Sequence, residues 1–150
     1  MKAVLQRVTG ASVKVDGKTV GTIEAGLLVF LGVAQGDTEE DARYIVEKIT
    51  SLRLFSDEQG KMNRSLSDNN GSVLLVSQFT LLGRTSKGRR PSFDAAASPE
   101  DAKALYERVA LDLRATGAFV ATGVFAAHMK VESINDGPVT FVVDSREKRS

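Results

Sequence analysis

Residues 73–82 form the stretch that most constrains how this chain can fold. The stretch opens with four consecutive apolar residues, and such a run is typical of a strand that is buried on both faces of a sheet. Three hydrogen-bonding side chains, Ser77, Gln78 and Thr80, then follow within four positions. A buried polar group without a partner costs about 1–3 kcal/mol. These side chains therefore either bond to neighbouring strands or line a site for a polar ligand.

Length and composition indicate a globular protein. A chain of 150 residues can bury a substantial core, and we expect a single domain over residues 1–150. Hydrophobic residues make up 42% of the chain and charged residues 26%, which are ordinary globular values. No apolar run approaches the roughly 18 residues of a transmembrane helix, and residues 1–8 look like a strand rather than a signal peptide. We therefore expect a cytoplasmic protein that does not enter a membrane.

The composition also excludes several kinds of catalytic site. Because the chain has no cysteine, thiol nucleophiles and thiolate zinc sites are excluded. His128 is the single histidine, so one chain cannot build a metal site from two or three histidines. We expect no metal and no cofactor. An enzyme with this composition would have to use backbone dipoles, hydroxyl groups and groups of its own substrate.

Positive charge is concentrated in one loop, although the formal net charge is only +1. Arg84, Lys87, Arg89 and Arg90 lie in a stretch that contains Gly and Ser, and further cations lie at residues 146–149. Loops of this kind often contact phosphate. A solvated loop that keeps the protein soluble is at least as common.

Periodicity and turn signals predict the secondary structure. An Asp-Gly pair at residues 16–17 predicts a tight hairpin. Thr38 and Ser98 are expected to cap two helices, and residues 55–71 are expected to form a long loop. Strands are expected over residues 2–8, 11–15, 19–23, 26–33, 72–82, 119–123, 129–134 and 139–144. With residues 2–8 and 11–15 counted together as the first strand, the order is β-β-β-α-β-α-β-β-β, which predicts a mixed α/β fold.

A second polar insert, residues 135–138, lies between two of the predicted closing strands. Its sequence Asn-Asp-Gly-Pro is strongly turn-like, so a plain turn is the simplest interpretation. A Gly-Pro pair can also adopt the cis bond, which occurs at about 5–6% of X-Pro bonds in folded proteins. Two adjacent carbonyls would then point the same way without any side chain.

The two polar inserts together resemble the two signature motifs of the D-aminoacyl-tRNA deacylases. The matching segments are Ser77-Gln78-Phe79-Thr80-Leu81 and Asn135-Asp136-Gly137-Pro138-Val139-Thr140. The resemblance runs almost from end to end, since residues 3–8, 26–29, 60–63 and 89–93 also match. His128 departs from the family pattern, in which acids are common at this position, and so leaves open how the rim of the site handles the substrate.

The resemblance implies a homodimer with a barrel-like, mostly antiparallel or mixed sheet and with active sites at the subunit interface. Ser77, Gln78, Phe79 and Thr80 are implied to be the catalytic residues, with the backbone N–H groups of Phe79 and Thr80 as oxyanion donors. Residues implied to bind the substrate or select its chirality are Met129, Asn135, Gly137, Pro138, Val139 and Thr140. Gly137-Pro138, as a cis pair, would reach into the pocket of the other subunit, and Met129 would lie near the terminal adenosine.

The implied reaction is hydrolysis of D-aminoacyl-tRNA, and also of mischarged glycyl-tRNA, while L-aminoacyl-tRNA is spared. Lys87, Arg89 and Arg90 would contact tRNA phosphate. Either Thr80 is the nucleophile, or the 2′-hydroxyl of the terminal adenosine activates the attack. A chain with one histidine lacks the usual base for a threonine, and aminoacyl esters are already reactive, so we favour the substrate-assisted route. His128 is then a rim or surface residue.

A non-catalytic tRNA- or RNA-binding module is the alternative function. Such modules use aromatic side chains as platforms for bases, whereas this chain has no Trp, two Tyr and no aromatic residue within residues 84–90. A purely structural dimer is a third possibility, but it leaves both polar inserts unexplained.

Overall fold

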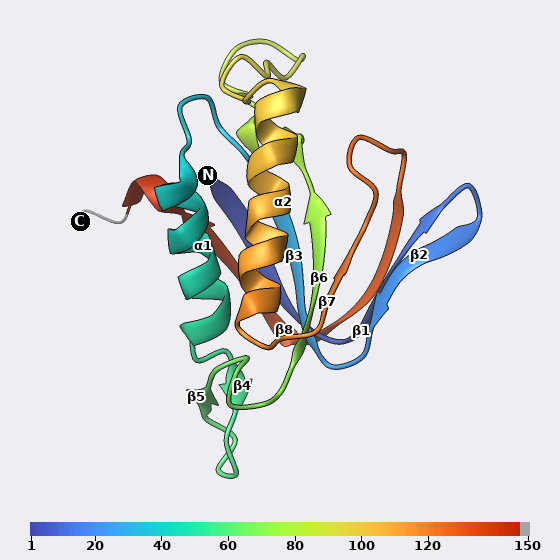
Figure 1. Cartoon of the computed structure of the whole chain (residues 1–150), viewed down its shortest axis with the longest axis vertical. Coiled ribbons are helices and arrows are strands. Elements are labelled where there is room, and N and C mark those ends of the chain that lie inside the picture. The colour runs from blue at the N-terminus through green and yellow to red at the C-terminus, as the bar shows by residue number, and fades with distance from the viewer. Residues whose placement is uncertain (148–150) are drawn as a thin grey trace.

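The computed structural model describes residues 1–147 (Figure 1); the cations Lys148 and Arg149 lie outside the described residues. The strands are β1 (Lys2–Val15), β2 (Lys18–Ile23), β3 (Gly26–Gly32), β4 (Phe55–Ser56), β5 (Met62–Arg64), β6 (Ser72–Ser77), β7 (Val120–Thr122) and β8 (Lys130–Asp144). The helices are α1 (Glu39–Ser51) and α2 (Pro99–Ala115), with two short 3₁₀ helices, η1 (Phe79–Leu82) and η2 (Ser145–Glu147). The predicted long loop at residues 55–71 thus contains the small β4–β5 hairpin.

Strand β1 is the centre of the main sheet because it pairs antiparallel with three other strands. Its first half pairs with β3 and its second half with β2. Strand β8 pairs with β1 along almost its whole length. Strands β3, β6 and β7 then run parallel to one another, so the sheet is mixed and the predicted α/β fold is confirmed.

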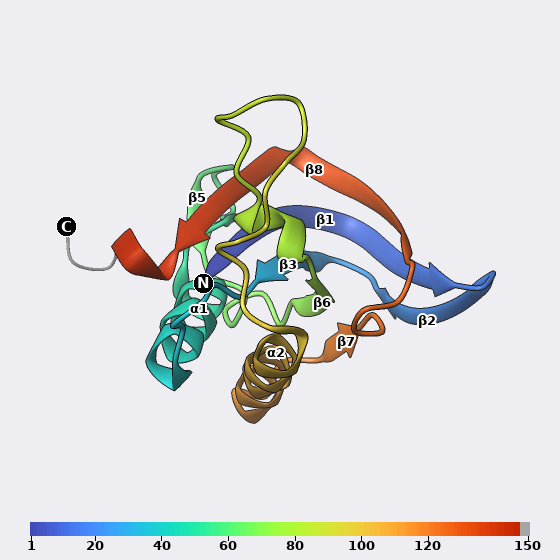
Figure 2. The same cartoon turned by 90° about the horizontal axis from the view of Figure 1, so that it is seen from above.

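The sheet curls until β2 comes close to β7, which makes it nearly a closed barrel (Figure 2). Gly21 permits this approach, because a Cβ atom there would lie only 2.5 Å from the carbonyl oxygen of Thr122. Inside the curl lies a small apolar cluster of Val8, Ala11, Val13, Ile23, Leu28, Leu74 and Val76. The close approach of β2 to β7 therefore requires a residue without a side chain at position 21.

Helices α1 and α2 pack side by side on the other face of the sheet (Figure 1). Both predicted caps are confirmed: the Thr38 hydroxyl accepts a hydrogen bond from the Glu40 N–H at 3.3 Å, and the Ser98 hydroxyl accepts one from the Asp101 N–H at 3.2 Å. Alternate sheet residues such as Leu5, Val29 and Leu75 point into the core beneath these helices. Among the residues that the structure describes, no helix is long and apolar enough to cross a membrane.

The strand predicted over residues 72–82 is too long, since β6 ends at Ser77 and η1 begins at Phe79. The N–H of Gly83 donates to the carbonyl of Thr80 at 3.0 Å, so local bonds replace pairing between strands. Gly32 makes room for this change, because a Cβ atom there would lie 2.5 Å from Leu82 Cδ2. The chain folds back over Gly32 instead of continuing along the sheet.

Two further boundary errors each divide a strand that is continuous. Residues 2–8 and 11–15 belong to the one strand β1, and residues 129–134 and 139–144 are joined in β8. The second insert is therefore not a turn between strands. It is a bulge, visible as register shifts in the pairing of β8 with β1, and an irregular insert can stay in a strand where the partner strand runs past it.

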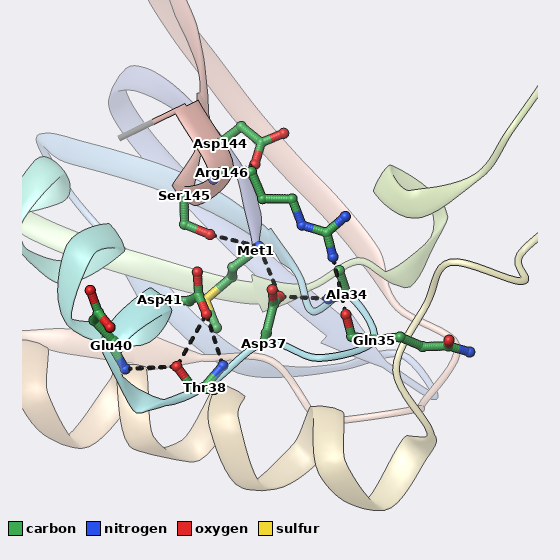
Figure 3. Close-up of polar contacts among 10 residues, drawn as sticks. All are labelled: Met1, Ala34, Gln35, Asp37, Thr38, Glu40, Asp41, Asp144, Ser145 and Arg146. Carbon is green, nitrogen blue, oxygen red and sulfur yellow. Dashed lines mark hydrogen bonds and ion pairs between the residues drawn. The ribbon is translucent and has the colours of Figure 1, made fainter. Parts of the chain in front are cut away.

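The amino group of Met1 is buried where the starts of β1 and α1 meet the end of β8 (Figure 3). It lies 2.8 Å from Asp37 Oδ2 and donates to the Ser145 hydroxyl at 2.8 Å. The Asp37 side chain is 2% exposed, and the same oxygen accepts the N–H of Ala34 at 2.7 Å. This buried ion pair joins three elements that are far apart in the sequence.

We predict that Asp37→Asn destabilises the protein by about 3–5 kcal/mol, because the buried ammonium loses its counter-charge. The amide oxygen can still accept from Ala34, so the change isolates the charge. Urea unfolding measures the midpoint shift at constant slope. The matched control is Asp112→Asn, which removes the partly exposed Arg108–Asp112 pair and should cost only about 0.3–0.5 kcal/mol. Equal shifts for the two variants would contradict the prediction.

Candidate active site

A cavity of about 580 Å³ lies beyond the end of β6, against α2 and the loop at residues 123–129. Most of its wall is apolar, and the polar side chains that reach it include Ser77, Gln78 and His128. The full lining is Leu31, Val33, Val76, Ser77, Gln78, Phe79, Phe93, Ala96, Ala97, Pro99, Ala102, Tyr106, Phe125, Ala126, Ala127, His128, Met129 and Val131. Among the described residues, no group of three or more His, Cys, Asp or Glu side chains is arranged to hold a metal ion.

The first predicted motif lies at this cavity. Ser77, Gln78 and Phe79 line it, and so does Met129 from the loop that precedes β8. Thr80 is exposed, and its hydroxyl accepts a hydrogen bond from the Gln78 side-chain amide. The motif thus presents one hydroxyl and one amide at the cavity, with a second hydroxyl held beside them.

Two backbone donors are also available in this motif. The N–H groups of Phe79 and Thr80 are the first two of η1. Within the described part of the chain, neither N–H has a hydrogen-bond acceptor. The first N–H groups of a helix have no partner within the helix. Because these two are adjacent, they can donate together to one oxygen atom of a ligand.

His128 lies at the rim of the cavity, as predicted for a surface or rim residue. Its side chain is exposed, and it contacts no hydrogen-bond or ion-pair partner among residues 1–147. A histidine that activates a hydroxyl must lie within hydrogen-bond reach of it. The structure provides no such contact between His128 and Thr80.

Tyr106 is a cavity residue that sequence reasoning missed. Its position on the apolar face of the second helix indicated only a core residue. The hydroxyl donates to the carbonyl of Leu75 at 2.8 Å, and the ring stacks at a tilt on Phe125, with centroids 5.8 Å apart. Burial raises the pKa of Tyr106 to about 12. The phenol therefore stays protonated at neutral pH and fixes one wall of the cavity.

The second predicted motif does not reach the cavity of its own chain. Asn135, Gly137, Pro138, Val139 and Thr140 lie on β8, and none of them lines that cavity. The Gly137–Pro138 peptide bond is cis, and both residues are exposed.

Side chains around the bulge hold it together from within β8. The Asn135 amide donates to the Thr140 hydroxyl at 3.0 Å, and its oxygen accepts the N–H of Val139 at 3.3 Å. The structure therefore separates the predicted site residues into two groups, one at the cavity and one on an exposed bulge.

Arg7 braces the bulge from the neighbouring strand β1. Its Nε lies 3.2 Å from the carbonyl oxygen of Asp136 and 3.3 Å from Asp136 Oδ2, while Nη1 donates to the carbonyl of Leu54 at 2.9 Å. Gly137 has φ +123°, and a Cβ atom there would lie 3.0 Å from Arg7 Nη2. From the sequence, Arg7 was only one residue of the segment 3–8, which matches the family outside the two motifs. The contact could not be found from spacing, because 129 residues separate the partners.

The basic loop rises from the edge of the cavity. Its base is closed by two hydrogen bonds between Arg84 and Ser92, of 2.7 and 2.9 Å. Lys87, Arg89 and Arg90 are all exposed, and none of them has a hydrogen-bond or ion-pair partner within the described residues.

Comparison with known proteins identifies the family. A family model described as D-Tyr-tRNA(Tyr) deacylase matches residues 4–144. The D-aminoacyl-tRNA deacylase of Geobacter sulfurreducens is 56% identical over 150 residues, which cover 100% of this chain and 99% of that protein. The corresponding protein of Heliobacterium modesticaldum is 59% identical over 146 residues, covering 97% of each chain.

Solved structures agree with these matches. The structure described as "c-Myc DNA Unwinding Element Binding Protein" has a TM-score of 0.91 at 41% identity, covering 96% of this chain and 98% of that one. A probable eukaryotic D-amino acid tRNA deacylase has a TM-score of 0.82, covering 95% and 97%, and its 19% identity supports the fold alone. The sequence matches, the fold and the two motifs agree, and this chain belongs to the D-aminoacyl-tRNA deacylase family.

Proposed function

We propose that this protein hydrolyses the ester bond of D-aminoacyl-tRNA. Water adds to the ester carbonyl carbon, the bond from that carbon to the ribose oxygen breaks, and the ribose oxygen takes up a proton. The products are a free D-amino acid and tRNA. The observation that carries the proposal concerns two adjacent N–H groups of this family member, that of Phe79, which lines the cavity, and that of Thr80. Neither has a hydrogen-bond acceptor among residues 1–147.

The terminal adenosine would occupy the cavity. Its volume of about 580 Å³ is within the range of ligand pockets, and its apolar wall suits a flat base. Met129, which directly precedes β8, and Val131 of β8 contribute to that wall. The ester carbonyl would then lie at the mouth, beside Ser77 and η1. There the two N–H groups would stabilise the oxyanion of the tetrahedral intermediate, and removing one such donor commonly costs about 10²–10³ in rate.

The arrangement favours activation of water by the substrate. The Thr80 hydroxyl accepts from the Gln78 amide, and His128 has no contact with it among the described residues. Without a base, Thr80 is a weak nucleophile. The 2′-hydroxyl of the terminal adenosine is adjacent to the ester and would help to orient or deprotonate the water.

A second copy of the chain would complete the site. Val142, Val4 and Phe30 lie side by side across β8, β1 and β3, on the sheet face that the helices do not cover. Val142 is 71% exposed. A contiguous exposed apolar surface marks an interaction site, and a homodimer with a shared active site is what the family resemblance implies. The exposed Gly137-Pro138 backbone of one subunit would then reach the cavity of the other.

The first prediction from the proposed function concerns the assembly. Sedimentation equilibrium at micromolar concentration should give twice the chain mass of 16.1 kDa. Val142→Asp should shift the protein towards the monomer, since a desolvated carboxylate without a partner opposes association. Val20→Asp is the matched control, because Val20 is an exposed apolar residue on the distant β2. A wild-type protein that sediments as a monomer would contradict the shared site.

The second prediction tests the function through chirality. If the Gly137-Pro138 backbone holds the α-amino group, a D side chain points to solvent, whereas an L side chain meets that backbone. Steric rejection of this kind can exceed the 1–3 kcal/mol of pocket-filling contacts. We expect D-tyrosyl-tRNA and D-aspartyl-tRNA to be cleaved alike, glycyl-tRNA also, and L-tyrosyl-tRNA more than about 100-fold more slowly.

The measurement is single-turnover ester loss with matched D- and L-aminoacyl-tRNA. Comparable rates for D- and L-tyrosyl esters would contradict the selection mechanism. Binding of tRNA without cleavage of any ester would favour the non-catalytic RNA-binding module instead.

The third prediction concerns Thr80. Thr80→Ala keeps the backbone N–H and should retain kcat within about tenfold, a change of roughly 1.4 kcal/mol. A substrate whose terminal adenosine lacks the 2′-hydroxyl should lose far more. Mass spectrometry of the quenched reaction checks for an acyl-enzyme. A trapped adduct on Thr80, or complete loss of turnover in a folded Thr80→Ala protein, would overturn the substrate-assisted route.

The fourth prediction concerns the basic loop, where Lys87, Arg89 and Arg90 would contact tRNA phosphate. Each phosphate contact adds about 0.7–0.9 to the slope of log affinity against log salt concentration. Replacing all three with Ala should therefore flatten the slope by roughly two units. The charge-matched control replaces Lys18, Arg43 and Lys61, which are exposed and do not line the cavity. If the salt dependence of binding is unchanged in the loop variant, the loop does not contact phosphate and is only a solvated surface.

The proposed substrate also bears on location. Aminoacyl-tRNA is made and consumed where translation takes place, so the proposed activity belongs in the cytoplasm. Fractionation of cells that carry the tagged protein would check this, and enrichment in the membrane fraction would contradict it.

A further inference from the structure

Two exposed aromatic rings stand together at the mouth of the cavity. Phe79 is 57% exposed and Phe93 is 39% exposed. Their ring centroids are 5.0 Å apart, with the planes at 65° in an edge-to-face arrangement. Both residues line the cavity. Two large rings exposed side by side at the mouth of a largely apolar cavity mark a candidate contact for a ligand.

The fold holds this pair in place. Phe79 begins η1, and Phe93 follows the base of the basic loop, where Arg84 and Ser92 bond to each other. Gly83 lies beneath Phe93, because a Cβ atom there would be 3.1 Å from Phe93 Cε1. The ring of Phe93 therefore rests on backbone and on Phe79, and part of its surface remains open to solvent.

The pair lies between the cavity and the cations. Phe79 precedes the basic loop in the chain and Phe93 follows it, while the cavity is on the inner side of both rings. A nucleic acid strand that passes from the cavity to the cationic loop would therefore come close to this pair. Single-stranded nucleic acids are commonly bound by a positive groove combined with aromatic rings on which bases stack.

We propose that Phe79 and Phe93 form a stacking platform for the base of the nucleotide that precedes the terminal adenosine. The inference rests on the proposed function, because it takes the adenosine to occupy the cavity. Every base has a π face, so stacking on the platform does not depend on which base is present. The platform adds affinity for the single-stranded end of the tRNA. Phe93 is the better of the two rings to substitute in a test, because it lies outside the Ser77–Leu81 motif.

The test uses two probes that the protein cannot hydrolyse: 3′-(D-tyrosylamino)-3′-deoxyadenosine and the same compound extended by a 5′-cytidylyl group. Their amide bond replaces the ester. Stacking contributes about 1–3 kcal/mol per base, so the wild type should bind the dinucleotide roughly 5- to 150-fold more tightly than the nucleoside. Isothermal titration of both probes at one salt concentration gives this ratio.

Variants of Phe93 separate stacking from packing. Phe93→Ala and Phe93→Leu should both bring the ratio close to one, although leucine keeps an apolar contact with Gly83. Phe93→Trp should restore the ratio. Phe119→Ala is the matched control, because Phe119 is 63% exposed and does not line the cavity, and it should leave the ratio unchanged.

Three results would overturn the platform: equal affinity of the wild type for the two probes, a Phe93→Leu variant with the wild-type ratio, or a loss of the ratio that accompanies a change in sedimentation mass. The last result would assign Phe93 to a contact between subunits. Failure of the proposed function looks different, since the wild type would then bind neither probe.

Discussion

Strand β1 is hydrogen-bonded along both edges, and the rest of the structure depends on this. Strands β3 and β2 share one edge of β1 in succession, while β8 occupies the other edge for nearly the full length. A strand of 14 residues in a right-handed twisted sheet cannot keep its two halves in one plane. The sheet therefore curls, and Gly21 allows β2 to approach β7. One curved sheet thus carries the cavity beyond β6 and the exposed bulge on β8.

Two glycines, Gly32 and Gly137, allow the backbone to lie where a side chain would otherwise be, at η1 and in the bulge of β8. At Gly32 the absence of a side chain lets η1 fold back over β3, and the first two N–H groups of η1 then have no acceptor within the described part of the chain. At Gly137 the positive φ and the nearby Arg7 guanidinium favour glycine, and the bulge exposes main chain. A protein with one histidine and no base beside Thr80 among its described residues is suited to positioning and electrostatic stabilisation, which serve an ester that is already reactive.

The aromatic pair changes how the basic loop is understood. Residues 84–90 of the loop include no aromatic residue. From the sequence, this argued against recognition of nucleic acid bases by the loop. The fold places Phe93 against Phe79 at the foot of the loop. These two residues are 14 positions apart in the sequence, and they meet where the Arg84–Ser92 bonds close the loop between them. Charge alone could indicate contact with phosphate, whereas contact with bases needed the spatial pairing.

The sequence by itself determined the features that depend only on residues close together in the chain. The caps at Thr38 and Ser98, the tight hairpin after β1 and the buried runs of β3 and β6 all form as predicted, because a cap or a turn is satisfied within about four residues. The two polar motifs were visible for the same reason. Only the tertiary structure decided that β6 stops at Ser77, that β8 continues through its bulge and that Arg7 braces Asp136. Whether a strand ends or continues depends on the strand that pairs with it. That partner is distant in the sequence, so a local sequence pattern does not reveal it.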